Sequence, residues 1–351
     1  MRDVAVVAFA QSRHAARDRE RNEVETIIPV VQEAVAASGI PRADIGFTVS
    51  GSCDYLSGGP FTFVAGLDAV GAWPPIRESH VEMDGAWALY EAWVTLQTGD
   101  ADSALVYAFG KSSLGDLHEI LALQTDPYHC APLWPSMVDL AALQACAHLE
   151  ATGRTERDLA EVAARSRRAA LGNPNAVVAE DVDAGELLAR PVTHPPLRHS
   201  DLPPVTDGAA AVVLAAGDLA RRVRQRPAWI RGIDHRIEAQ GLGVRDLASS
   251  ASARMAAERA GVAGGPVDVA ELHAQFSHEE LILRDALGLD GGVPVNPSGG
   301  PLAANPYMSA GLIRIGEAAA RIHDGSAGRA VAHAAQGPCL QHNLVCVLEG
   351  E

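Results

Sequence analysis

The chain alternates between short, largely apolar runs and longer segments whose apolar residues recur with helical spacing. Val4–Phe9, Ile45–Ser50 and Ala104–Phe109 predict strands that are buried on both faces, because such strands lack a polar side. Val24–Ser38 and Gly85–Thr98 have helical spacing, and a glycine follows each, as expected for the residue that ends a helix. This alternation of strand and helix predicts a layered α/β fold.

The pattern occurs a second time in the C-terminal part of the chain. Asp207–Ala216 closes the first series as a further buried strand. The second series comprises four predicted strands and three predicted helices: Ala228–His235, Val267–Leu272, Arg329–Ala335 and Asn343–Leu348, and Ser249–Ala260, Ser277–Leu287 and Gly311–His323. We therefore expect two similar halves, residues 1–220 and 221–351, derived from a duplicated unit.

Residues from about 110 to 205 break this rhythm. They contain a polar and aromatic stretch at Asp126–Trp134, an apolar helix near Val138–Leu149 and a charged helix near Thr155–Leu171, followed by a proline-rich segment. The sequence thus predicts an insertion in the first half that covers one face of the sheet.

Composition and charge limit the classes of function. The 351 residues are 48% hydrophobic and 21% charged, with a net charge of −16, which argues against nucleic-acid binding and against binding to an anionic membrane surface. A few local arginines or backbone donors could still hold the phosphates of CoA. No run reaches the roughly 18–20 apolar residues of a membrane helix. The first ten residues, MRDVAVVAFA, have too short an apolar core for a signal peptide, so we expect a cytoplasmic enzyme.

The sequence shows no pattern typical of a metal or cofactor site. The five cysteines are scattered without a CxxC motif, which argues against a disulfide framework and a zinc site. The cluster around Asp126, His129 and Cys130 lacks a second cluster with ligand spacing. The glycine-rich segment Asn296–Gly300 does not have the spacing of a phosphate or dinucleotide loop, so we predict neither nicotinamide nor flavin.

Five segments, in order, resemble the thiolase superfamily, and most closely its lipid-transfer-protein branch, the sterol-carrier-protein-type thiolases. Asn296–Gly311 resembles the Asn-Pro-Ser-Gly-Gly…Gly-His-Pro motif, and Glu271–Glu280 resembles the His-Asp-Cys-Phe segment. The other three are Gly153–Leu171, Thr206–Ala215 and Leu340–Leu344. The resemblance spans most of the chain and implies a thiolase fold, with two mixed-sheet halves in an α-β-α-β-α arrangement, and a homodimer formed through the thiolase core.

The chain departs from the family at the nucleophile. A thiolase carries a reactive cysteine at the N-terminus of a central helix, where the helix dipole lowers the pKa of the thiol. The matching stretch here is Val81–Ala92, in which Gly85 takes the cysteine position after Asp84. No cysteine lies between Cys53 and Cys130. A glycine cannot form an acyl-enzyme, so thiolysis by the usual route is not expected.

Two further departures alter the rest of the site. Asn305 replaces the histidine of the Gly-His-Pro motif, and its partner position in the other motif is His273. The C-terminal glycine-rich turn is shortened, and Cys339 lies just before it.

Loss of the cysteine removes acyl transfer, but an enolate beside a thioester can still be stabilised by oxyanion donors and an acid or base. The candidate residues are His273, Asn305, Tyr307, His342 and Asp84. The resemblance extends to cysteine-less steroid side-chain-cleaving aldolases of the same branch. It implies retro-aldol cleavage of a steroid β-hydroxyacyl-CoA to a 17-ketosteroid and a short acyl-CoA such as propionyl-CoA, with a small OB-fold partner that helps to hold the CoA thioester.

Each candidate also has a purely structural explanation. His273 could be a hydrogen-bonded core histidine, Tyr307 a packed loop aromatic, and Asn305 a turn cap. Asp84 could only cap the helix that follows it, and His342 could simply flank the last strand. Two other functions also remain open: a catalytically silent subunit that binds acyl-CoA or scaffolds a complex, and an acyltransferase that uses Cys339.

Overall fold

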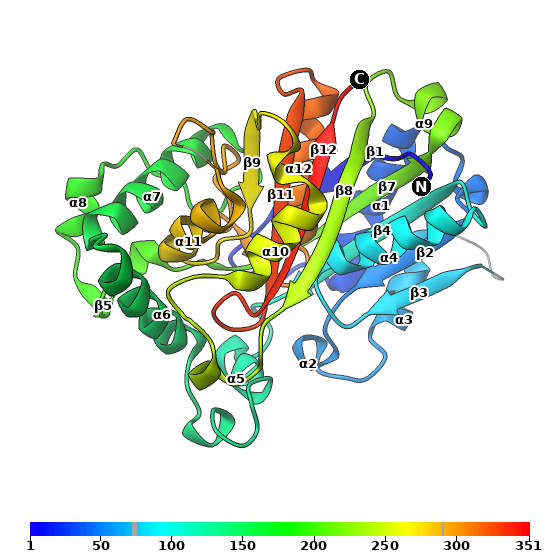
Figure 1. Cartoon of the computed structure of the whole chain (residues 1–351). Helices are drawn as coiled ribbons and strands as arrows, with labels where there is room; N and C mark the ends of the chain where they lie inside the picture. The colour runs from blue at the N-terminus through cyan, green and yellow to red at the C-terminus, as the bar shows by residue number, and fades with distance from the viewer. Residues whose placement is uncertain (72–75, 290) are drawn as a thin grey trace.

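The computed structural model describes residues 1–71, 76–289 and 291–351 and contains one large mixed sheet (Figure 1). Its strands follow the order β3-β2-β4-β7-β1-β8-β12-β11-β9, and β10 pairs with β7. Their bounds are β1 Val4–Gln11, β2 Phe47–Gly51, β3 Glu78–Val81, β4 Ser103–Lys111, β7 Val205–Ala216, β8 Ala228–Ile237, β9 Val269–Leu272, β10 Asn305–Pro306, β11 Arg329–Gln336 and β12 His342–Glu349. A separate pair comprises β5 Val192–His194 and β6 Leu197–Arg198.

The strand pairing repeats between the two halves of the sheet. In the first half β1 is antiparallel to β7, β7 is antiparallel to β4, and β4 is parallel to β2. In the second half β8, β12, β11 and β9 are related in the same way. The halves join where β1 pairs with β8 through Ala5–Trp229 and Val6–Ala228. The expected arrangement of two similar mixed-sheet halves is therefore confirmed, while the boundary at residue 220 stays a prediction.

Helices lie on both faces of the sheet, and four more, α5 to α8, belong to the insertion beside it. The helices are α1 Glu23–Ser38, α2 Asp54–Ser57, α3 Phe63–Leu67, α4 Gly85–Thr98, α5 Leu117–Leu123, α6 Met137–Thr152, α7 Glu156–Ala169, α8 Ala184–Leu188, α9 Gly217–Val223, α10 Ala251–Ala260, α11 Ser277–Leu287 and α12 Ala310–His323. Helices α4 and α12 share one apolar core that extends from β2 to β11. Helix α1 packs on the other face of β1, β4 and β7, and α10 and α11 pack on the other face of β9, β11 and β12. This is the expected α-β-α-β-α layering.

The insertion after β4 supplies helices α5 to α8, drawn in green shades to one side of the sheet in Figure 1. Its α6 and α7 share an apolar cluster with Phe276, which lies immediately before α11, and α7 and α8 pack on Leu302. The insertion therefore covers α11 and the loop that leads to β10, and these in turn cover the sheet. None of the helices within the described residues is long and apolar enough to cross a bilayer.

Candidate active site

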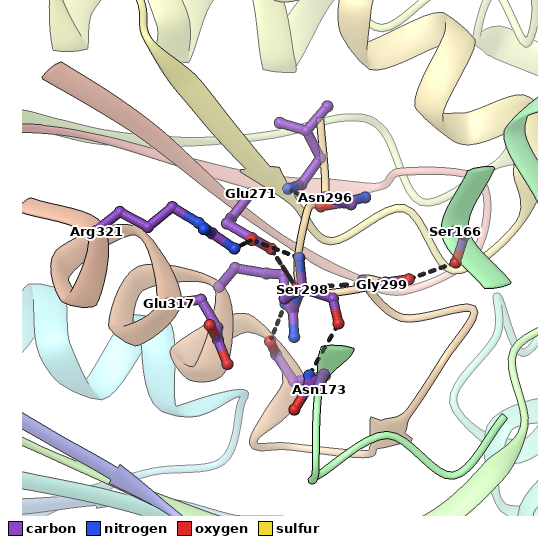
Figure 2. A network of polar contacts seen from close by, with 12 residues as sticks. Ser166, Asn173, Glu271, Asn296, Ser298, Gly299, Glu317 and Arg321 are labelled. Carbon is purple, nitrogen blue, oxygen red and sulfur yellow. Dashed lines mark hydrogen bonds and ion pairs between the residues drawn. The ribbon is translucent and has the colours of Figure 1, made fainter. Parts of the chain in front are cut away.

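A buried network anchors the loop between α11 and β10 (Figure 2). Asn305 begins β10 at the end of this loop, and Tyr307 follows β10 directly. Glu271 in β9 is fully buried, and its Oε2 accepts hydrogen bonds from Ser298 Oγ and Arg314 Nη1, both at 2.7 Å. The backbone N–H of Ser298 donates to Glu271 Oε1 at 3.2 Å. Burial raises the pKa of Glu271, and the Arg314 guanidinium opposes that shift. The pair fixes the start of the loop to both β9 and α12.

The insertion holds the same loop from its other side. Asn173 donates to the Ser298 carbonyl at 2.8 Å, and the Ser166 hydroxyl donates to the Gly299 carbonyl (Figure 2). Gly299 has a φ of 93°, and a Cβ there would lie 2.7 Å from the Cβ of Ala303. Only glycine combines this left-handed backbone with so close an approach. The network thus fixes the loop that leads to β10.

His273 and Asn305 form the buried pair that the motif resemblance suggested. His273 Nδ1 accepts the backbone N–H of Ala335 at 3.2 Å, so its hydrogen lies on Nε2 and is donated to Asn305 Oδ1 at 3.2 Å. Burial, aided by His333 and Arg314, lowers the pKa of His273 to about 3. The imidazole is therefore neutral at physiological pH and both its nitrogens are engaged. Neither residue belongs to the wall of the cavity described next.

A cavity of about 280 Å³ lies beside this pair, and Tyr307 and His342 both line it. Gln336 accepts the Asp84 backbone N–H through Oε1 at 3.1 Å, and its Nε2 donates to Tyr307 Oη at 3.3 Å. This leaves the phenol hydrogen of Tyr307 to donate into the cavity. Burial strongly raises the pKa of Tyr307, so the phenol stays protonated. The cavity wall is completed by Cys53, Glu82, Met83, Leu121, Gln124, Met137, Gln275, Phe276, Glu279, Gly337, Pro338, Cys339 and Gln341.

Glu279 is a buried acidic residue of the cavity wall that was not among the candidates from the sequence. Its side chain is 5% exposed, and its Oε2 accepts the backbone N–H groups of Gln275 at 2.8 Å and Phe276 at 3.2 Å. No described residue donates to its Oε1. Burial raises the pKa of Glu279 to about 7, and the two N–H donors oppose the shift. Glu279 is the third residue of α11, where a glutamate can accept the backbone N–H of the N-cap residue, here Phe276, and this position along the chain does not reveal that it lines a cavity.

His342 lies at the start of β12 and is partly buried, with its ring edge-on to Trp87 at 6.3 Å between centroids. Burial lowers its pKa, and His235 and Arg245 add to the effect. His342 therefore lines the cavity chiefly as a neutral imidazole.

Asp84 caps two helices and does not line the cavity. Its carboxylate accepts the backbone N–H groups of Ala86 at 2.9 Å, Gly311 at 2.8 Å and Leu312 at 3.0 Å, at the N-termini of α4 and α12. Burial raises its pKa to about 7, against these three donors. The contacts match the structural explanation of Asp84 and tie the two central helices together.

The expectation that Gly85 takes the position of the nucleophile is wrong. A Cβ at Gly85 would lie 2.5 Å from Ala108 Cβ and 2.9 Å from Leu312 Cδ2, inside the core. The residues of this turn that line the cavity are Glu82 and Met83. A cysteine able to attack a bound thioester would have to replace one of them, and neither is a cysteine.

Two cysteines line the cavity, and burial raises the pKa of both thiols. The pKa of Cys339 rises to about 12, and its Sγ donates to the Leu140 carbonyl at 3.3 Å. The pKa of Cys53 is raised as well. The reactive form of cysteine is the thiolate, so both side chains lack the activation that an acyl-transfer nucleophile requires.

The structure gives no site for a metal within the part of the chain it describes: no group of three or more His, Cys, Asp or Glu side chains converges there. His129 and Asp126, considered above as metal ligands, instead pair with each other at 2.9 Å, with the imidazole well exposed.

Comparison with known proteins gave no matching family model. An acetyl-CoA acetyltransferase of Methanothermobacter thermautotrophicus is 27% identical, over 98% of this chain and 96% of its own length. Sterol carrier protein 2 of Gallus gallus is 26% identical, over 89% of this chain and 64% of its own length.

Among solved structures, the Ltp2-ChsH2(DUF35) aldolase superposes with a TM-score of 0.82 and 18% identity, covering 99% of this chain and 98% of the matched one. At that identity the likeness concerns the fold. The fold and the relatives agree with the resemblance that the motifs indicated.

Proposed function

We propose that this protein, a member of the thiolase superfamily, cleaves the Cα–Cβ bond of a β-hydroxyacyl-CoA by a retro-aldol reaction without an acyl-enzyme. The observation that carries the proposal is the set of side chains that line the cavity. It is lined by a protonated phenol and a carboxyl of shifted pKa, while both of its thiols are held protonated. Such a site can handle an enolate and its proton but lacks an activated nucleophile.

The reaction requires three events at the substrate. A base takes the proton of the β-hydroxyl, and the Cα–Cβ bond breaks as the β-carbon becomes a ketone. The electron pair of that bond forms the thioester enolate, and a proton then adds to the α-carbon. The products are a ketone and a shortened acyl-CoA, and no external oxidant or reductant is needed.

Tyr307 is the residue we assign to the thioester oxygen. Its phenol hydrogen is free to point into the cavity because Gln336 already donates to its oxygen. A hydrogen-bond donor aimed at the developing enolate oxygen stabilises the transition state more than the substrate. Asn305 does not line the cavity, so we assign it to positioning: its side-chain oxygen is engaged by His273, and it lies two residues before Tyr307. His273 then acts by orienting Asn305, and Asp84 by holding α4 and α12 together; His342 contributes a neutral imidazole to the wall.

For the substrate we propose a steroid β-hydroxyacyl-CoA, with a 17-ketosteroid and propionyl-CoA as products. The aldolase of the same fold and the sterol-carrier-protein relatives support this choice. The matched aldolase includes a DUF35 chain, which supports a small OB-fold partner that helps to hold the CoA thioester. A homodimer through the thiolase core belongs to the same proposal.

The test is an incubation of the purified chain, alone and with such a partner, with a steroid β-hydroxyacyl-CoA. The proposal predicts equal amounts of 17-ketosteroid and propionyl-CoA. If neither product appears, both without the partner and with it, the silent acyl-CoA-binding subunit is favoured.

Acyl transfer is the second candidate, since a relative over nearly the whole chain is named an acetyltransferase. The nucleophile would then be Cys339, the cysteine considered from the sequence. Incubation with acetyl-CoA followed by intact-mass measurement decides between them, because transfer through cysteine predicts an added acetyl group and the retro-aldol route predicts none.

A further inference from the structure

Two carboxyls line the cavity, and their surroundings differ. Glu82 is exposed at the mouth, where Oε1 accepts the Asp54 backbone N–H at 2.6 Å and Oε2 lies 3.4 Å from His80 Nε2. Glu279 is buried in the wall, with one oxygen held by backbone donors and the other without a donor among the described residues. Only Glu279 therefore combines a fixed position with a free oxygen on the cavity side.

The local structure keeps the Glu279 carboxyl in one orientation. It stands in the first turn of α11, and Gln275 and Phe276, just before the helix, donate to the same oxygen. A base held by two hydrogen bonds needs little reorganisation when a substrate arrives. Its pKa of about 7 lets both protonation states exist near neutral pH, which suits a group that must accept a proton and then release one.

The other titratable groups of the wall are less suited to this role. Tyr307, Cys53 and Cys339 hold their protons, because burial raises the pKa of each. The pKa of His342 is lowered, and Glu82 has both oxygens engaged.

We infer that Glu279 carries the proton of the reaction: its free carboxylate oxygen takes the β-hydroxyl proton of the acyl-CoA and then delivers a proton to the α-carbon. The inference rests on the proposed function and assigns the acid–base role that the motif residues left open. The carboxylate becomes a carboxylic acid as the ketone forms. It returns to a carboxylate as the enolate becomes the acyl-CoA, so proton and charge balance over one turnover.

The first experiment is Glu279→Gln in the full chain, because glutamine keeps an oxygen for the Gln275 and Phe276 N–H groups but cannot take up the proton. We expect turnover of the steroid β-hydroxyacyl-CoA to fall ~10²-fold or more, with loss of the pH dependence near neutrality. Glu25→Gln is the matched control, since Glu25 is likewise the third residue of its helix, α1, and accepts the backbone N–H of the N-cap residue Asn22, away from the cavity. It should retain native turnover. Native turnover in Glu279→Gln would overturn the inference and leave the proposed function standing.

A second measurement tests the proton transfer by Glu279 without requiring cleavage of the steroid substrate. In the reverse direction Glu279 would remove an α-proton from propionyl-CoA, so the native chain in D₂O should introduce deuterium at the α-carbon, read by mass. Glu279→Gln should lose this exchange ~10²-fold or more, whereas Glu25→Gln should keep it. Equal exchange in both variants would overturn the inference, even if no steroid substrate were cleaved. A native chain that neither cleaves nor exchanges would overturn both the inference and the proposed function.

Discussion

Glu271 and Glu279 are two buried carboxyls eight positions apart, and they illustrate two uses of one side chain. Glu271 faces Arg314 and Ser298, which give its oxygens charged and neutral donors. Glu279 has only two backbone donors on one oxygen, and its other oxygen is left toward a cavity. Burial raises the pKa of both. The difference lies in the partners: a paired carboxylate fixes a loop, and an unpaired one is available for chemistry.

Glu271→Gln should give the largest loss of stability. It leaves the Arg314 guanidinium buried without its countercharge, an arrangement that costs about 3–5 kcal/mol. Urea unfolding at constant pH measures the loss. Glu349→Gln is the control, because the Glu349 side chain is 35% exposed where it pairs with Arg329 and Arg231, and ion pairs in contact with solvent contribute about 0–1 kcal/mol each. Equal losses in the two variants would show that the buried pair does not anchor the loop.

Tyr307→Phe should have the next largest effect, on turnover. Removal of the phenol hydroxyl leaves the thioester enolate without its donor and should lower turnover ~10²-fold or more. Steady-state kinetics with the steroid β-hydroxyacyl-CoA measures this. Tyr128→Phe, on the exposed surface of the insertion, should match the native rate. An unchanged rate in Tyr307→Phe would remove the phenol from the mechanism.

The pH dependence of stability should distinguish Glu279 from a neutral residue. Its folded-state pKa of about 7 lies above the ordinary value of 4.5, so folding favours the protonated form. The stabilisation is complete below about pH 4.5 and is lost as the pH rises through 7. Glu279→Gln should therefore gain stability over the native chain between pH 5 and 8, by about 1–3 kcal/mol. Asp84 and Glu271 titrate in both proteins, so their contributions cancel in the difference between the two free energies of unfolding. A difference that does not change with pH would place Glu279 in a water-like environment.

Asp84→Asn should have the smallest effect, confined to stability. The amide retains one acceptor oxygen for the N-termini of α4 and α12, so we expect a loss of about 0.5–2 kcal/mol, as for other helix caps. Turnover of the folded variant should stay near the native value. A fall in turnover of ~10²-fold without loss of stability would return Asp84 to the catalytic group.

The strong patterns in the sequence located the core elements well. The helices Gly85–Thr98 and Ser277–Leu287 have the predicted bounds, because each combines an apolar face with a following glycine in the left-handed region. Strand β3 was missed: its sequence ESHV is only partly buried throughout, so it lacks both an apolar run and a clean alternation. Pairing with β2, which the chain pattern does not show, makes it a strand.

The site could be predicted only in part, because sequence places residues along the chain but not toward a cavity. The motifs brought His273 and Asn305 together correctly, but the tautomer of His273 depends on the backbone N–H of Ala335, which is remote in sequence. Gly85 was assigned to the nucleophile position because a short motif does not reveal which residue of a turn faces the cavity and which faces the apolar core. Glu279 was not a candidate because the sequence does not show that the first turn of α11 faces the cavity.

The most direct test of the central claim is a single-turnover reaction of the native chain with a steroid β-hydroxyacyl-CoA, in which products and the intact mass of the protein are followed together. We predict that the 17-ketosteroid and propionyl-CoA appear in equal amounts while the protein mass stays unchanged throughout. An acylated protein that forms and decays on the way to products would contradict cleavage without a cysteine intermediate.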